Sequence, residues 1–170
     1  MRRTIFSLAR IVAIGLAATL PLAGCSTLFG SDSTFGAAQA PVADVPDASS
    51  YTADRALSEA RQHFANNDFG YSAALYKRVV ELQGKDPEGY IGLGASYDRL
   101  GRFDLSDRVY ASLLALTGPT AQYYNNVGYS MMLRGNLGSA LSNFRKAKAL
   151  DPGNAVVDNN IAMLTGAKGA

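Results

Sequence analysis

Four segments of this chain repeat one another at a spacing of 34 residues, and this repetition limits the fold more than any other feature. The segments begin at Ala53, Pro87, Ala121 and Ala155 and align without a gap. Equivalent positions carry one kind of residue: small at the eighth (Ala60, Gly94, Gly128, Ala162), large and apolar at the seventeenth (Phe69, Phe103, Leu137), a ring at the twenty-fourth (Tyr76, Tyr110, Phe144) and leucine at the thirtieth (Leu82, Leu116, Leu150). A period of this length is typical of stacked helical hairpins, in which each unit buries its apolar face against its neighbours.

Each full unit has the pattern of two helices joined by a tight turn. Apolar residues recur three and four positions apart, as from Tyr90 to Leu100, which places them on one face of a helix. Gly101 and Gly135 then end that helix, and Asn67 occupies the same position in the first unit. Because both residue types tolerate the left-handed conformation that ends a helix, the sequence predicts helical hairpins over residues 53–164.

The third unit carries the residues by which the chain resembles the tetratricopeptide repeat (TPR) family: Tyr124, Val127, Gly128, Gly135, Ala140, Phe144, Ala147, Leu150 and Pro152. The first unit departs from the family pattern, with Ala56 and Glu59 where an aromatic residue and a leucine are usual. The resemblance implies an all-α fold, a short TPR solenoid of about three helix-turn-helix repeats. Residues 155 to about 164 are expected to form a C-terminal capping helix, and residues 165–170 a disordered tail.

The N-terminus has the pattern of a secretion signal and not of a folded element. Arg2 and Arg3 form a positive start, and the apolar run over residues 11–20 is too short to span a bilayer. Residues 22–25, Leu-Ala-Gly-Cys, resemble the lipobox of bacterial lipoproteins, which implies that residues 1–24 are removed and that Cys25 receives the lipid. The alternative is an ordinary secretory signal followed by a cysteine without a special role.

Residues 25–52 are expected to connect the lipid to the repeats as a disordered tether. The segment contains Pro41 and Pro46 with several Gly and Ser residues, and it has no helical or strand period. A flexible coil of about 25 residues reaches roughly 25–30 Å, enough to hold a domain clear of a membrane surface. Phe29 and Phe35 leave open that part of this segment packs along the domain.

Charge and residue types argue against nucleic acid as a partner and against catalysis. Removing the signal leaves 13 basic against 14 acidic residues, a net charge of −1, which lacks the clustered basic residues that nucleic-acid binding needs. Cys25 is the only cysteine, so an internal disulfide is impossible. His63 is the only histidine, and its repeat position predicts a ring packed inside or at the rim of the first hairpin. No metal-ligand cluster, nucleophile motif or phosphate loop is present in the sequence, so neither an enzyme nor a bound cofactor is expected.

Protein binding is the function that the TPR resemblance implies, because the first helices of successive hairpins line a concave groove in that family. Carried over position by position, the groove would contain Asp54, Leu57, Arg61, Phe64, Glu88, Ile91, Asp98, Arg99, Gln122, Asn125, Asn126, Tyr129, Met132, Asn159, Asn160 and Met163. Two Asn-Asn pairs recur one repeat apart in this set. Asparagine both donates and accepts hydrogen bonds, so it can hold the backbone of a bound peptide, and one member of each pair is expected to bond to a neighbouring helix instead.

The combination of lipobox, tether and short repeat array is similar to the TadD-type lipoproteins of the Tad (Flp) pilus assembly system. That resemblance implies an outer-membrane lipoprotein that faces the periplasm and supports secretin localisation or pilus assembly. Ser26 follows the lipidated cysteine where an aspartate would imply retention at the inner membrane. The alternative function is a periplasmic scaffold for envelope proteases or peptidoglycan enzymes.

Overall fold

The structure is a computed structural model that describes residues 41–45 and 47–166, and these residues form seven α-helices and no strand. The predicted signal, Cys25 and residues 26–40 lie outside the described residues. The helices are α1 (Ala53–Ala65), α2 (Phe69–Leu82), α3 (Pro87–Arg99), α4 (Phe103–Thr117), α5 (Ala121–Leu133), α6 (Leu137–Leu150) and α7 (Ala155–Thr165), preceded by a short 3-10 turn, η1 (Ala48–Ser50). Within this part of the chain, no helix combines the length and the apolar character needed to cross a bilayer.

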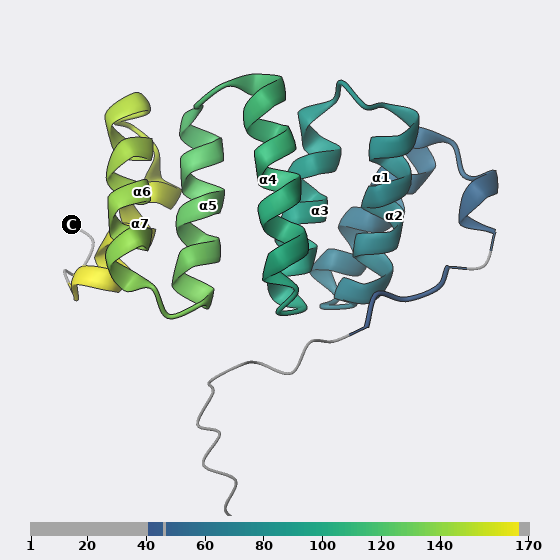
Figure 1. Cartoon of the computed structure of the whole chain (residues 1–170), viewed down its shortest axis with the longest axis horizontal. Helices are drawn as coiled ribbons and strands as arrows, with labels where there is room; N and C mark the ends of the chain where they lie inside the picture. Colours follow the sequence, from purple (N-terminus) through teal and green to yellow (C-terminus); the bar gives the residue numbers. More distant parts are fainter. Residues whose placement is uncertain (1–40, 46, 167–170) are drawn as a thin grey trace, which may run out of the picture. The chain divides into compact units, whose positions relative to one another are not determined.

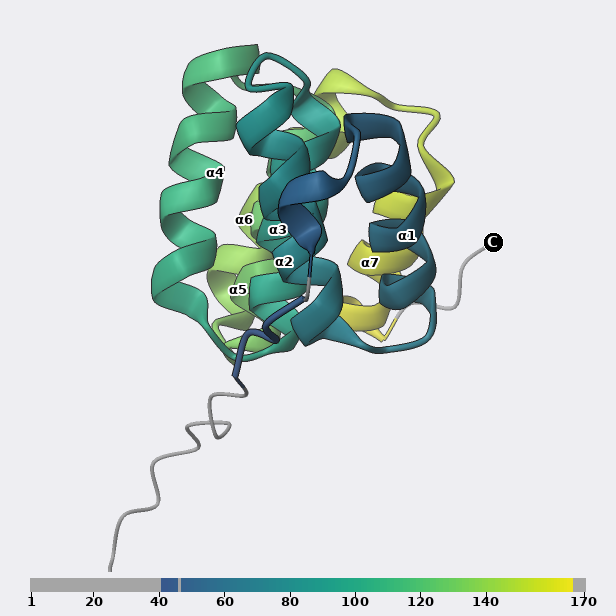
Figure 2. The ribbon, with the colours of Figure 1, turned by 90° about the vertical axis from the view of Figure 1, so that its right-hand side faces the viewer.

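The helices form three hairpins and a final single helix, as the 34-residue repeat predicts. Hairpin 1 is α1 with α2, hairpin 2 is α3 with α4, and hairpin 3 is α5 with α6; α7 packs on α6. Figure 1 shows the hairpins side by side along the array. Seen along the array in Figure 2, α1 and α7 lie on one side and α4 lies on the other. The fold is therefore an all-α solenoid of three repeats with a terminal helix.

The turns inside the hairpins confirm the predicted helix ends. Asn67, Gly101 and Gly135 have φ angles of 63°, 69° and 76°, in the left-handed region. A side chain on Gly135 would meet no neighbouring atom, so backbone conformation and not space favours glycine there.

Buried apolar residues gather in two clusters that share no residue. The first lies in hairpins 1 and 2 and contains Ala60, Ala73, Leu75, Tyr76, Leu93, Tyr97 and Leu100. The second lies in hairpin 3 and α7 and contains Ala140, Phe144, Ala147 and Val157. The repeats are therefore continuous in sequence, but their buried apolar interior is divided between hairpins 2 and 3.

The described end of the predicted tether lies against hairpin 1. Val42, Val45 and Tyr51 pack on the first apolar cluster, and the guanidinium of Arg78 on α2 donates a hydrogen bond of 2.8 Å to the carbonyl of Ser49. A side chain on Gly70 would come within 3.1 Å of backbone atoms of this segment, so its glycine permits the close approach. Residues 41–45 and 47–51 thus cover the outer side of hairpin 1.

Candidate protein-binding groove

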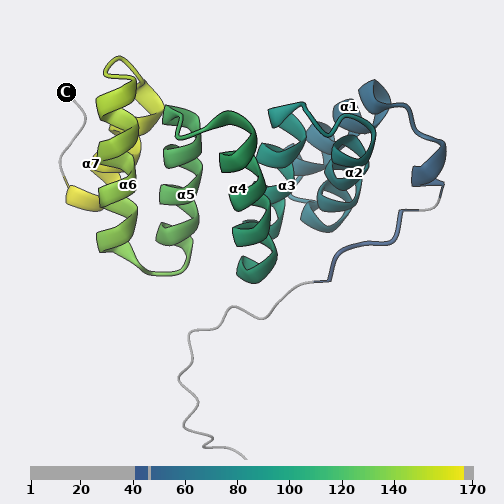
Figure 3. The ribbon, with the colours of Figure 1, turned by 45° about the horizontal axis from the view of Figure 1, so that its top comes forward.

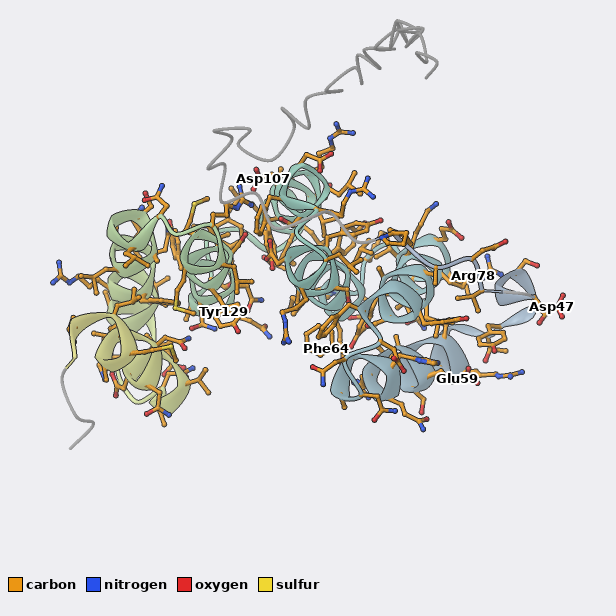
Figure 4. The ribbon with its side chains drawn as sticks, turned by 90° about the horizontal axis from the view of Figure 1, so that it is seen from below. Asp47, Glu59, Phe64, Arg78, Asp107 and Tyr129 are labelled. Carbon is orange, nitrogen blue, oxygen red and sulfur yellow. The ribbon has the colours of Figure 1, made fainter. Side chains whose placement is uncertain are left out.

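The first helices of the hairpins, together with α7, line one side of the array. In Figure 4, which looks at the array from below, α1 and α7 project toward the same side and α3 and α5 lie between them. Phe64 and Tyr129, both labelled there, lie on this side, whereas Asp107 of α4 lies on the opposite side. We call the surface formed by α1, α3, α5 and α7 the groove.

The two asparagine pairs meet in the C-terminal half of the groove. Asn160 on α7 donates a hydrogen bond of 2.8 Å from Nδ2 to Oδ1 of Asn125 on α5, so one member of each pair ties two helices together. Asn126 Nδ2 is buried and has no hydrogen-bond partner among the described residues. Asn125 and Asn126 also line a shallow hollow with Gln122. Asn126 is therefore the groove residue with an unused buried donor.

Exposed side chains surround these asparagines. Asn159 and Met163 are exposed, and 64% of the surface of Met163 is accessible. Tyr129 and Met132 are half-buried and pack on the second apolar cluster. A thioether and a phenol ring beside amide groups offer adaptable apolar area next to hydrogen-bonding groups.

The N-terminal half of the groove is more charged. The guanidinium of Arg61 on α1 forms an ion pair with Glu88 on α3, in which the Nε to Oε1 distance is 2.8 Å. Phe64 is half-buried and its ring lies edge-on to that of Phe69, with 5.3 Å between centroids. Arg99 lies over the Phe69 ring at 4.2 Å and is otherwise exposed.

Asp98 does not lie on the groove surface as predicted. Its side chain is buried, with 3% of the residue accessible, because it turns into the junction between hairpins 2 and 3. Its Oδ2 accepts a hydrogen bond of 2.9 Å from the Tyr110 hydroxyl, and its Oδ1 accepts one of 2.6 Å from Ser130. Burial raises the pKa of the Asp98 carboxyl, an effect that hydroxyl hydrogen bonds and the Arg134 charge partly offset.

Arg134, a residue that the sequence analysis did not single out, completes this polar junction from the end of α5. Its two terminal nitrogens bind Asp107 on α4, with Nη1 to Oδ2 at 2.9 Å, and Nη2 also donates to Ser130 Oγ at 2.9 Å. The hydrogen bond to Asp107 is the main reason that the pKa of Arg134 is raised. The sequence does contain a signal for this junction, because the charged residues Asp98 and Arg134 stand at repeat positions where the preceding unit has apolar ones. Those equivalent residues are Phe64 and Leu100.

His63 lies at the rim of hairpin 1, in agreement with its predicted packing role. Its ring stacks on Tyr71 with 5.2 Å between centroids, and its Nδ1 is 3.4 Å from Asp68. Across the described part of the chain, no group of three or more His, Cys, Asp and Glu residues could hold a metal ion.

Solved structures share this fold at low sequence identity. No family model and no curated protein matches the chain. The first TPR domain of human RPAP3 superposes with a TM-score of 0.59 at 16% identity, over 68% of this chain and 91% of that domain. The Yersinia enterocolitica type III secretion translocator chaperone SycD superposes with a TM-score of 0.58 at 16% identity, over 67% of this chain and 92% of that protein. The first TPR of Spaghetti (RPAP3), solved with the HSP90 peptide SRMEEVD, superposes with a TM-score of 0.57 at 16% identity, over 68% of this chain and 91% of that domain. The fold of the repeats is therefore that of a short TPR solenoid.

Proposed function

We propose that this chain is a lipid-anchored adaptor of the bacterial outer membrane whose groove binds a protein partner in the periplasm. The partner we propose is the secretin or another component of the Tad (Flp) pilus assembly system. The fold supports a binding role, since one TPR domain with a similar fold was solved with a peptide bound. The lipobox at residues 22–25 and the resemblance to TadD-type lipoproteins support the location and the partner.

The unpaired amide of Asn126 is the observation that carries the binding proposal. A buried donor without a partner costs free energy, about 1–3 kcal/mol, and a peptide carbonyl would recover it once the Asn126 side chain turns toward the groove. Asn125 is already held by Asn160, so it offers its remaining hydrogen-bonding groups in a fixed orientation. Tyr129 and Met163 then supply apolar contact on either side.

Site-specific photocrosslinking in the bacterium tests the groove. A photoreactive phenylalanine analogue replaces Tyr129, and a second strain carries it in place of Lys77, which is exposed on α2, a helix that is not part of the groove. We expect a crosslink to the secretin from position 129 and none from position 77, and we expect Asn126→Ala to weaken it. Equal crosslinks from both positions, or no effect of Asn126→Ala, would contradict the assignment of the groove.

Asn160→Ala is less suitable as a binding test than Asn126→Ala. Asn160 is buried and ties α7 to α5, so its removal would disturb the groove itself. The Asn126→Ala variant leaves that hydrogen bond in place.

Cys25→Ser tests the anchor independently. The cysteine thiol is the group that accepts the lipid, and stable attachment needs more than one acyl chain. We expect the Cys25→Ser protein to leave the membrane fraction. A variant that stays in that fraction with its signal removed would show that the thiol is not the anchor.

A scaffold for envelope proteases or peptidoglycan enzymes is the second candidate function. The same crosslinking strains distinguish the two, because the species joined to position 129 identifies the partner class. Deleting the gene should reduce surface pili and secretin multimers if the pilus proposal is correct. Normal piliation with altered levels of cell-wall enzymes would favour the scaffold.

A further inference from the structure

The junction between hairpins 2 and 3 differs from the rest of the array in how its helices meet. α2 and α3 pack closely along their length, whereas α4 and α5 meet at few residues. Figure 3 shows the α4 and α5 ribbons farther apart than those of α3 and α4. Leu114 on α4 remains 36% exposed, whereas Val80, its equivalent on α2, packs on the first apolar cluster. We call the contact of α2 with α3 the first junction and that of α4 with α5 the second junction.

Two bulky residues explain why the second junction stays open. α3 presents Gly89 and Gly92 to α2, and a side chain on Gly92 would come within 2.2 Å of the Tyr76 ring. The equivalent residues of α5 are Tyr123 and Asn126. Burial raises the pKa of Tyr123, with smaller contributions from Tyr124 and from Asp107 on α4. A side chain at these two positions takes up space that glycine leaves free between α2 and α3, and α5 packs less closely on α4 than α3 does on α2.

Hydrogen bonds and an ion pair join hairpins 2 and 3 at the second junction. Ser130 and Arg134 of α5 reach Asp98 on α3 and Asp107 on α4, and the Tyr110 hydroxyl supports Asp98 from the other side. Asp107 is 54% exposed, so water competes for one end of this set of contacts. Hydrogen bonds weaken steeply as their distance and angle change, so these contacts favour one placement of hairpin 3 relative to hairpin 2.

We infer that the second junction is a hinge, about which hairpins 1 and 2 move as one body and hairpin 3 with α7 as another, and that the Asp98–Ser130 and Arg134–Asp107 contacts are its latch. Phe64 and Tyr129 lie on different bodies, so movement about the hinge changes the width of the groove. The effect of this movement on partner binding rests on the proposed function. A peptide that contacts both residues binds one hinge conformation more tightly than the others and shifts the population toward that conformation.

Distances between spin labels in the free protein test the hinge. The full chain carries Cys25→Ser, which leaves no other thiol, and cysteines replace exposed residues of α2 and α6, Lys77 and Arg145. A second pair, at Lys77 and Arg108, lies within the first body. In the Ser130→Ala protein, we expect the distribution of distances between labels at positions 77 and 145 to broaden and its mean to shift. The distribution of distances between labels at positions 77 and 108 should stay the same.

The repeat supplies a matched control for this variant. Ser96 is buried at the position equivalent to Ser130, and its hydroxyl lies 3.0 Å from that of Ser72 across the first junction. Ser96→Ala should leave both distributions unchanged. If Ser130→Ala loses helicity, Asp107→Asn tests the same latch from the exposed side. Folded Ser130→Ala and Asp107→Asn proteins with the parent's Lys77–Arg145 distribution would overturn the hinge. This measurement uses no partner, so its failure and that of the groove crosslink are distinguishable.

Discussion

The two junctions of this array have the same place in the repeat but different chemistry. In the first junction, Val79 and Val80 lie against Gly89 and the Tyr76 ring lies against Gly92. In the second junction, the buried Asp98 carboxylate and the Arg134 guanidinium form hydrogen bonds between the hairpins, and Leu114 of α4 remains exposed. A repeat therefore determines the hairpin, while the residues that face the next hairpin determine how firmly the two are joined.

The difference traces to a few equivalent positions. Where Ala73 and Leu100 form part of the first apolar cluster, the next unit has Asp107 and Arg134, which form an ion pair. Apolar packing is insensitive to salt and to pH, whereas an ion pair and a buried carboxylate respond to both. The two junctions should therefore respond differently to mutation, pH and salt.

The largest effect is expected from leucine at the Gly92 position. Gly92→Leu places a side chain into the Tyr76 ring and should lower the free energy of unfolding by about 3 kcal/mol. The matched variant Asn126→Leu puts the same residue at the equivalent position of the open junction and should cost less than about 1 kcal/mol. Chemical denaturation of both variants measures the difference. Equal losses would mean that the two junctions are packed alike.

Asp98→Ala should have the next largest effect. It leaves the buried hydroxyls of Tyr110 and Ser130 without their acceptor, which should cost about 2 kcal/mol in the free energy of unfolding. Hydrogen exchange should show faster opening of amides in α5 than in α3, because the loss is at the second junction. Asp98→Asn keeps an acceptor oxygen and should lose less. Uniformly faster exchange over all hairpins would argue that Asp98 supports hairpin 2 itself.

The helices and their ends could be predicted from the sequence because they depend on local pattern. The predicted unit starts Pro87, Ala121 and Ala155 are the first residues of α3, α5 and α7. The left-handed residues Asn67 and Gly101 end their helices as expected. These features depend on residues close together in the chain, and the same local pattern occurs in successive repeat units.

The second junction was harder to predict because it depends on pairs of residues in different units. The repeat position of Asp98 predicts that it lies in the groove, but the side chain turns inward because Tyr110 and Ser130 offer it hydrogen bonds. Arg134 follows the predicted helix and has no role in the repeat pattern. The sequence signal for both residues is a change from an apolar to a charged residue at equivalent positions of successive units.

The pH dependence of stability should report Asp98 directly. Burial raises the pKa of its carboxyl above the ordinary 3.8, so the native protein holds this proton more tightly than the unfolded chain. The contribution of Asp98 to the free energy of unfolding is therefore full below pH 3.8 and is lost as the pH rises through the native pKa. The groups that face it are Ser106, Ser130, Tyr110 and Arg134, and Asp107 adds its charge through Arg134.

Subtracting the stability of Asp98→Asn from that of the parent isolates this contribution. The difference should decrease as the pH rises above about 4, with a slope no steeper than about 1.4 kcal/mol per pH unit. Chemical denaturation of both proteins at several pH values measures it. A difference that increases with pH would mean that the hydrogen bonds outweigh burial and that the carboxylate is the favoured form.

The smallest effect is expected from the exposed end of the latch. Asp107→Asn removes the ion pair with Arg134, and because Asp107 is half-exposed the loss should be about 0.5 kcal/mol. Raising the salt concentration from about 0.05 M to about 1 M should reduce that loss, since salt screens exposed charges. Asp104→Asn is the control, because Asp104 is an exposed carboxylate on the same helix that forms no ion pair within the described residues. A salt-independent loss at Asp107 would show that Arg134 holds the second junction by packing on Phe103, 4.7 Å from its guanidinium, and that the latch has the same apolar character as the first junction.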